Sequence, residues 1–126
     1  MSVCVLIVED SREMRTAFRE LLENLGGFAV AAEFPGETGA TEWLQLNRQR
    51  WDVAVIDLML SEGSGFNLIA RCRTARRAAE IIVFSDFATP VIKQRCIDLG
   101  ADAVFSKGEA DKMADYLEGV RDRTRS

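Results

Sequence analysis

Short apolar runs alternate along the chain with longer segments in which apolar residues recur every three to four positions. The runs predict five β-strands, at 3–8, 28–34, 53–56, 81–84 and 103–105. The longer segments predict five helices, at about 11–25, 37–48, 66–73, 89–99 and 110–121. Thr89 and Pro90 form a typical helix start, and Gly26 and Gly100 follow the predicted ends of the first and fourth helices. The pattern therefore indicates five consecutive β/α units.

Five β/α units joined by short connections predict a parallel sheet with helices on both faces. Right-handed crossovers leave few ways to order the strands. Among these we predict a flavodoxin-like, doubly wound α/β fold with five strands in the order 2-1-3-4-5, in which ligands bind at the C-terminal ends of strands 1 and 3. We expect one domain over residues 1–121 and a C-terminal tail over residues 122–126.

Polar residues follow four of the predicted strands. Glu9 and Asp10 come after the first strand and Asp57 after the third, while Ser85 and Lys107 come after the fourth and fifth. The C-terminal ends of parallel strands meet at one edge of the sheet, so these side chains are expected to converge. Carboxylates gathered at one point repel one another unless a cation lies among them. We therefore predict a divalent metal site beside a reactive aspartate, Asp57.

The absence of histidine limits the chemistry of this site. It excludes Ser-His-Asp and Cys-His nucleophile systems, histidine-based zinc sites and phosphohistidine carriers. A metal must then be held by oxygen ligands, which favours magnesium, calcium or manganese. A carboxylate that attacks a phosphoryl group needs neutralisation of the transferred charge more than it needs a base. Magnesium, the ammonium of Lys107 and the hydroxyl of Ser85 would supply that neutralisation.

The composition is that of an ordinary globular domain. A chain of 126 residues can bury a core without disulfides or structural metal, and no window approaches membrane-spanning length. A net charge of −4 argues against sequence-independent nucleic-acid binding. The N-terminus lacks a secretory signal pattern, and Cys4, Cys72 and Cys96 lack disulfide or metal spacing and are expected to be core residues. These features predict a cytoplasmic protein.

The strand-end residues also match the pattern of a known family. From Val3 to about Val120 the chain resembles the receiver domain of bacterial two-component response regulators. The resemblance rests on an acidic pair, an aspartate with a glycine eight positions beyond it, a hydroxyl and a lysine, namely Glu9, Asp10, Asp57, Gly65, Ser85 and Lys107. These residue types occur in the correct order and at the correct strand ends, which makes the match specific.

The resemblance implies a phosphorelay switch. Asp57 would accept a phosphoryl group from the phosphohistidine of a sensor histidine kinase or a histidine phosphotransfer protein. Ser85 would move toward the phosphate and Lys107 would pair with it. The output would be a change in the surface formed by the fourth helix, fifth strand and fifth helix, which a downstream protein or an effector domain recognises. The chain would not be an enzyme, apart from catalysing its own phosphorylation from phosphodonors and its own dephosphorylation.

The resemblance also implies a metal set and a range of partners. Asp10 and Asp57 would bind Mg²⁺ directly, Glu9 would act through water, and the backbone carbonyl of Met59 would complete the protein ligands; Mn²⁺ is an alternative ion. The large apolar residues two positions after Asp57 and Ser85 are Met59 and Phe87, which predict restricted access for water and a long-lived phosphoryl group. The chain would be a monomer or a phosphorylation-linked dimer, with no nucleic-acid or membrane contact by this domain.

Four positions depart from the family's usual pattern. Val104 occupies the position of an aromatic switch residue, and Phe105 is predicted on the opposite face of the strand. Gly108 and Ser61 replace prolines that commonly follow the lysine and the phosphorylated aspartate. Asp86 replaces a small residue, and its carboxylate could repel phosphate or rearrange the metal site. These departures indicate an atypical output mechanism.

Two other functions belong to different classes. A degenerate receiver would bind a partner without phosphorylation, and Asp86, Val104 and Gly108 favour that alternative. A phosphohydrolase with an aspartyl-phosphate intermediate usually needs a second acid two residues after the nucleophile, where this chain has Met59. The receiver with phosphorylation at Asp57 remains the leading hypothesis.

Several conspicuous residues are expected to have structural roles. Trp43 and Trp51 are predicted to pack beside the second helix. Val91 is predicted on the inward face of the fourth helix, with Ile92, Cys96 and Leu99. Four arginines on the third helix and the loop after it are expected to form a solvated face: Arg71, Arg73, Arg76 and Arg77.

Overall fold

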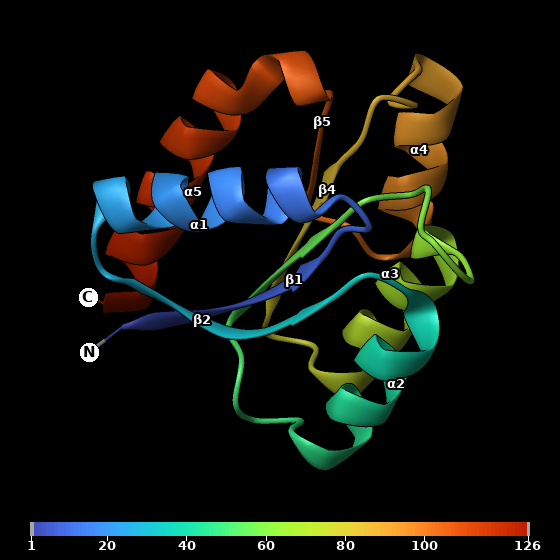
Figure 1. Cartoon of the computed structure of the whole chain (residues 1–126), viewed down its shortest axis with the longest axis horizontal. Coiled ribbons are helices and arrows are strands. Elements are labelled where there is room, and N and C mark those ends of the chain that lie inside the picture. Colours follow the sequence, from blue (N-terminus) through green and yellow to red (C-terminus); the bar gives the residue numbers. More distant parts are fainter. Residues whose placement is uncertain (1, 126) are drawn as a thin grey trace.

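Five parallel strands form one sheet in the computed structural model, which describes residues 2–125 (Figure 1). The strand order is β2-β1-β3-β4-β5, so the predicted flavodoxin-like, doubly wound fold is confirmed. The strands are β1 (Val3–Val8), β2 (Phe28–Phe34), β3 (Val53–Ile56), β4 (Glu80–Phe84) and β5 (Ala103–Phe105). The helices are α1 (Arg12–Leu25), α2 (Glu37–Leu46), α3 (Gly65–Ala75), α4 (Pro90–Leu99) and α5 (Ala110–Arg125), with a short 3₁₀ turn, η1 (Lys107–Glu109), before α5.

Two helical layers cover the sheet, with α1 and α5 on one face and α2, α3 and α4 on the other (Figure 1). Successive side chains of a strand point to opposite faces, so Leu6 and Val8 of β1 join one core while Val5 and Ile7 join the other. All four residues of β3 are buried. A strand covered on both faces needs an unbroken apolar run, which is why the strands are visible in the sequence. Within residues 2–125 no helix has the length and apolarity to cross a membrane.

Side-chain caps begin three of the helices. The hydroxyl of Ser11 accepts a hydrogen bond from the backbone N–H of Met14 at 3.2 Å, so Ser11 caps α1 from outside the helix. Ser64 caps α3 in the same way, and Thr89 caps α4 immediately before Pro90. At the other end of α4, Gly100 has a φ of 119°, a left-handed conformation that favours glycine.

Three predicted helix ends are wrong. The helix α3 continues two residues past its predicted end, to Ala75. The other two differences have side-chain causes. The helix α2 ends at Leu46 instead of residue 48, because the side-chain amide of Asn47 donates to the carbonyl oxygen of Trp43 at 2.9 Å. The helix α5 continues to Arg125 instead of ending at residue 121, so residues 122–125 of the predicted tail 122–126 are helical, and residue 126 lies outside the described residues. The last turns of α5 are held by Arg121, which donates to the carbonyl of Leu25 at the end of α1. In the same part of α5, Arg123 forms an ion pair with Glu80 at the start of β4, with 3.0 Å between Nη2 and Oε1. The sequence pattern contains no apolar repeat over these last residues.

The prediction that Val91 faces inward is wrong, because its side chain is 79% exposed. The buried residue of α4 is Cys96, and Ile92 and Leu99 lie on the same stripe at spacings of four and three. Val91 lies five residues from Cys96 and so points well away from that stripe. The first turn of α4 therefore presents an apolar side chain to solvent.

Two of the four arginines predicted to be solvated are structural. Arg76 donates to the backbone carbonyl of Trp51 and pairs with Asp52. Arg73 donates to the carbonyl oxygens of Gly100, Arg77 and Ala79, at distances between 2.7 and 3.0 Å, and to Asp102 at 2.6 Å. It thereby ties α3 to the start of β4 and to the turn between α4 and β5.

The prediction for the other two arginines holds. The side chains of Arg71 and Arg77 are exposed. Arg71 lies 3.8 Å from Glu37 on the neighbouring helix, at the edge of ion-pair range.

The tryptophans and two cysteines are core residues, as predicted. Trp51 is fully buried, and Trp43 packs on Phe34 with ring centroids 6.4 Å apart. Burial raises the pKa of the Cys72 thiol to about 12, which makes it an inert apolar side chain at neutral pH. Cys4 is the exception, because it is only partly buried.

Gly65 begins α3 where that helix meets the end of β3. A Cβ atom at this position would lie 2.1 Å from the backbone oxygen of Asp57 and 2.7 Å from the Cα of Leu58. The backbone N–H of Gly65 also donates to the carbonyl of Leu58 at 3.2 Å. This close approach of two backbones requires glycine and explains the residue eight positions after Asp57.

The role of Arg73 predicts a loss of stability on substitution. Arg73→Met should lower the free energy of unfolding by about 2 kcal/mol, because three backbone carbonyl oxygens, most of them partly buried, lose their charged donor. Urea denaturation followed by tryptophan fluorescence would measure this. Arg77→Met is the matched control, since its side chain is exposed and its change should stay within about 0.5 kcal/mol. Equal midpoints for the two variants would contradict the assignment.

The packing of Gly65 predicts a cost for a single added methyl group. Gly65→Ala should destabilise the protein by about 2–3 kcal/mol, because the backbone at Asp57 and Leu58 must shift. Gly108→Ala is the control, because a Cβ there meets no atom within 4 Å. Thermal unfolding of both variants would test the contrast, and an unchanged Gly65→Ala midpoint would show that this contact is not tight.

Candidate functional site

The register of the sheet brings four strand ends to one edge. Val8 pairs with Ile56, Ile56 with Val83, and Phe84 with Phe105. The backbone pairing continues one residue further, because the N–H of Asp57 donates to Val8 at 2.9 Å and the N–H of Ser85 donates to Phe105 at 3.0 Å. The polar residues that follow these strands therefore leave the sheet side by side.

Lys107 lies between two buried carboxylates. Its Nζ atom is 2.9 Å from Oδ2 of Asp57 and 3.0 Å from Oε1 of Glu9. Glu9 and Asp57 are only 5% and 6% exposed. The convergence of Lys107 on Asp57 is thus found as predicted, and three segments far apart in the sequence share one charged contact.

Glu9, Asp10 and Asp57 form an acidic cluster. One carboxylate oxygen from each lies within 4.8 Å of the other two, and Asp10 is the exposed member. Three carboxylates face one lysine, so ionisation of all three leaves an excess of negative charge. Hard oxygen ligands in this number suit Mg²⁺ or Mn²⁺, and the residues present fit such an ion.

Burial and hydrogen bonding shift the ionisation of two site residues. Burial raises the pKa of Glu9 to about 7, against the opposing effect of hydrogen bonds from the backbone N–H of Ser11 and from Lys107. For Lys107, burial acts to lower the pKa, but the hydrogen bonds and charges of Asp57 and Glu9 outweigh it and raise the pKa above its usual value. Lys107 is therefore a cation throughout the neutral range.

Ser85 and Asp86 differ sharply in their surroundings. Ser85 is fully buried, and its hydroxyl oxygen accepts a hydrogen bond from the backbone N–H of Phe87 at 3.3 Å. That bond does not use the hydroxyl proton, which stays available for an anion. Asp86 is exposed and is not a member of the acidic cluster found among residues 2–125. Its charge is therefore solvated in this structure.

The loop after Asp57 folds back on itself. The backbone N–H of Met59 lies 3.4 Å from Oδ1 of Asp57, and Met59 forms an antiparallel bridge with Ser64. Met59 and Phe87 are 57% and 53% exposed, so neither apolar side chain is part of the core. A metal role for the Met59 carbonyl stays a prediction.

Hydrogen bonds between this loop and the start of α2 hold the loop in place. Ser61 donates to the carbonyl of Pro35 through both its N–H and its hydroxyl, at 3.3 and 2.9 Å. Glu62 accepts from the N–H of Thr38 at 2.6 Å, and in return Glu37 accepts from the N–H of Ser64 at 2.8 Å. Glu62, in the loop before α3, thus binds the N-terminus of α2, and Glu37, the first residue of α2, binds the backbone N–H of the residue that caps α3.

The sequence prediction missed these capping residues. Glu37 and Glu62 lie 24 or more residues from the groups that they bind, and no local pattern marks them. Glu109 was also missed, although it completes a capping box with Ser106. In that case the S-x-x-E spacing is a recognised sequence signal.

Val104 and Phe105 lie on opposite faces of β5, as predicted. Val104 packs against the core beneath α2, α3 and α4. Phe105 packs on the α5 side, in edge contact with Tyr116 at a centroid distance of 5.7 Å. The position of the family's aromatic switch is therefore filled by a small, partly buried residue.

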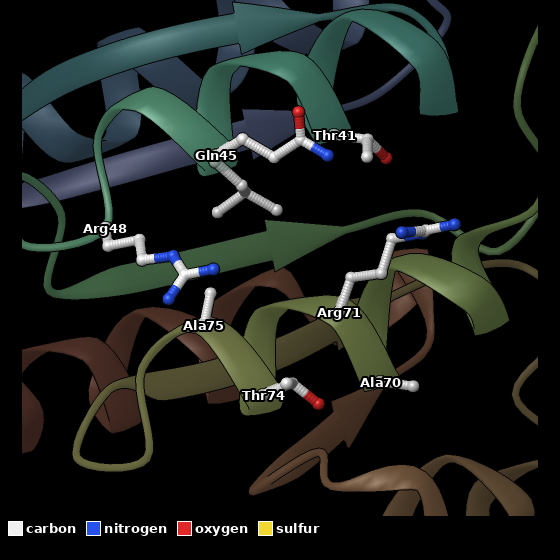
Figure 2. Close-up of a pocket in the computed structure, with 8 residues that line it drawn as sticks. Thr41, Gln45, Arg48, Ala70, Arg71, Thr74 and Ala75 are labelled. Atoms are coloured by element: carbon white, nitrogen blue, oxygen red, sulfur yellow. The ribbon is translucent and has the colours of Figure 1, made fainter.

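A separate groove of about 330 Å³ lies between α2 and α3 (Figure 2). Arg48, in the turn after α2, and Arg71 of α3 line it together with Leu44 and Ala75. None of the strand-end residues lines it. This groove is therefore separate from the charged cluster at the C-terminal edge of the sheet.

Comparison with known proteins agrees with this geometry. The family model described as "Response regulator receiver domain" matches residues 5–118. The transcriptional regulatory protein DltR of Streptococcus agalactiae is 32% identical over 122 residues, which are 96% of this chain and 51% of DltR. The nitrate/nitrite response regulator protein NarP of Escherichia coli is 34% identical over 119 residues, 93% of this chain and 53% of NarP. The chain spans about half the length of these two relatives.

A solved structure shows the same fold. A response regulator protein from Burkholderia pseudomallei, described with a phosphorylated aspartic acid, a calcium ion and citrate, superposes with a TM-score of 0.75 at 23% identity. The match covers 84% of this chain and 60% of that one. With the family model matching most of the chain and the acid, hydroxyl and lysine at their expected strand ends, the chain belongs to the response regulator receiver domains.

Proposed function

We propose that this domain is a phosphorylation switch in a two-component system, with Asp57 as the phosphoryl acceptor. The observation that carries the proposal is the position of Asp57, which is nearly buried, adjoins two further carboxylates and contacts the ammonium of Lys107 at 2.9 Å. A structural ion pair would not need a second and third acid at the same point. An acceptor of phosphoryl groups does, because the acids bind the metal that neutralises the transferred charge.

The transfer step requires little from the protein beyond position and charge. A carboxylate oxygen of Asp57 attacks the phosphorus of a phosphohistidine in a partner kinase or phosphotransfer protein. A P–O bond forms, the P–N bond breaks, and its electron pair stays with the imidazole nitrogen. Lys107 stabilises the phosphoryl oxygens as a fixed cation, and Ser85 donates its hydroxyl proton to one of them.

Mg²⁺, or Mn²⁺ in its place, fits the acidic cluster as the resident ion. Asp10 and Asp57 would hold it directly, the carbonyl of Met59 would add a ligand, and Glu9 would act through water. When bound, the ion neutralises charge on the transferred phosphoryl group. The description of the Burkholderia protein, with both a phosphorylated aspartic acid and a divalent ion, supports this pairing on the same fold. Beyond its own phosphorylation and dephosphorylation, the domain would turn over no substrate.

The output surface would be formed by α4, β5 and α5. Two apolar residues of α4 support this, since Val91 is 79% and Ile97 43% exposed on a helix whose other side is packed. A downstream protein or an effector domain could cover them. Because Val104 replaces the usual aromatic residue, a change at Ser85 would reach this surface through backbone and packing shifts.

The acceptor role predicts uptake of one phosphoryl group from a small phosphodonor such as phosphoramidate. Intact-mass measurement should show a single addition in the presence of Mg²⁺, none after chelation of the metal, and recovery with Mn²⁺. Asp57→Asn should abolish uptake because the nucleophile is lost. Asp86→Asn is the matched control and should retain it, since Asp86 is exposed and outside the cluster. No uptake by the wild type with several donors would favour a degenerate receiver instead.

The large apolar residues two positions after Asp57 and two positions after Ser85 predict slow hydrolysis of the phosphoryl group. Met59 and Phe87 are large and apolar, and they should limit the approach of attacking water. The phosphorylated state of the isolated domain should outlast seconds, and Phe87→Ser should shorten it. Loss of phosphoryl label over time measures both. A wild-type lifetime of seconds, or a Phe87→Ser lifetime equal to that of wild type, would contradict this prediction.

A further inference from the structure

Lys107 is carried by a short turn whose backbone is held by a side chain. The turn η1 spans Lys107–Glu109, and Ser106 precedes it in extended conformation. Oε1 of Glu109 accepts a hydrogen bond from the backbone N–H of Ser106 at 2.9 Å and from its hydroxyl at 3.1 Å. The N–H of Glu109 also donates to the carbonyl oxygen of Ser106 at 2.9 Å. Hydrogen bonds between Ser106 and Glu109 thus close the turn that contains Lys107.

Gly108, the next residue, gives this turn no rigidity of its own. It is not among the glycines with positive φ, and a Cβ at this position would meet no atom within 4 Å. Neither conformation nor space therefore requires glycine here. Glycine at this position increases the conformational freedom of the backbone next to Lys107, in the unfolded chain and wherever the turn opens. The hydrogen bonds between Glu109 and Ser106 oppose that freedom.

The charge of Glu109 is maintained at neutral pH. Hydrogen bonds from Ser106 and from Lys112 lower the pKa of Glu109 to about 2. Lys112 contributes from the outer side, with its Nζ 3.3 Å from Oε2. Glu109 therefore acts as a carboxylate acceptor under the conditions in which the switch operates.

We propose that Glu109 is a positioning residue for Lys107. By closing the capping box with Ser106, it fixes the backbone from which the Lys107 side chain reaches Asp57 and Glu9. The base of the side chain is thereby held at the position from which its ammonium reaches the acceptor. Glu109 itself touches none of the reacting groups. The kinetic part of this inference rests on the proposed phosphorylation of Asp57.

The capping box also begins α5, so a merely structural role must be separated from positioning. A double-mutant cycle does this, because Glu109 should matter to the reaction only while Lys107 is present. The initial rate of Asp57 phosphorylation by phosphoramidate at saturating Mg²⁺ is the measurement. Glu109→Ala should lower the maximal rate about tenfold, with the half-saturating donor concentration little changed. In a Lys107→Met background the same change should alter the rate by less than about twofold.

Conservative variants and a matched control sharpen the test. Glu109→Gln should recover most of the rate, since its amide oxygen can accept from Ser106. Lys112→Met removes only the exposed partner of Glu109 and should stay within about twofold of wild type. If Glu109→Ala does not fold, Ser106→Ala and its conservative partner Ser106→Thr interrupt and restore the hydroxyl part of the same box. Ser106→Ala should then lower the rate of phosphorylation, and Ser106→Thr should retain most of it.

A readout without phosphodonor separates this inference from the proposed function. The side-chain NMR resonances of Lys107, in the absence of donor, should move in Glu109→Ala and stay in place in Lys112→Met. If the wild type takes up no phosphoryl group, the proposed function fails, and the resonances still decide the positioning. An unchanged rate and unchanged resonances in Glu109→Ala would overturn the inference. So would an equal rate loss with and without Lys107.

Discussion

The ammonium of Lys107, held between the carboxylates of Asp57 and Glu9, is the interaction on which this site depends. Two nearly buried acids next to each other are costly unless an opposite charge neutralises them, and a lone charge left in such a place costs even more. The contact joins the ends of β1, β3 and β5 at one point. In the proposed function the same charges would also serve chemistry, because a cation already placed at Asp57 would need little reorganisation when a phosphoryl group arrives.

Hydrogen bonds from side chains to backbone give the loops of this site their rigidity. The loop after Asp57 is tied to α2 by Ser61, Glu37 and Glu62, and the turn with Lys107 is tied by Glu109. At two of these places, residues 61 and 108, related domains commonly have proline. Proline stiffens a chain covalently, whereas this protein reaches a fixed backbone through acceptors placed on neighbouring segments. The hydrogen bonds around residues 61 and 108 thus compensate locally for the missing prolines.

The rest of the molecule supports the site from both faces of the sheet. Leu6 and Val8 of β1 pack under α2, α3 and α4, while Val5 and Ile7 pack under α1 and α5. Because these interiors are closely filled, the strand ends cannot move independently. A change at the carboxyl edge would have to pass through the packing of β5, where Val104 replaces an aromatic side chain, to reach the exposed apolar residues of α4.

The amino-acid sequence by itself determined the strands, the order of the fold and the convergence of Asp57 and Lys107. These follow from apolar periodicity and from the rule that parallel strands end at one edge, which are local or topological properties. Only the tertiary structure decided the roles of Arg73, Glu37 and Glu62, the solvent exposure of Val91 and the length of α5. Each of these depends on backbone groups or helix faces contributed by distant segments, and their register exists only once the sheet and its two helical layers have packed.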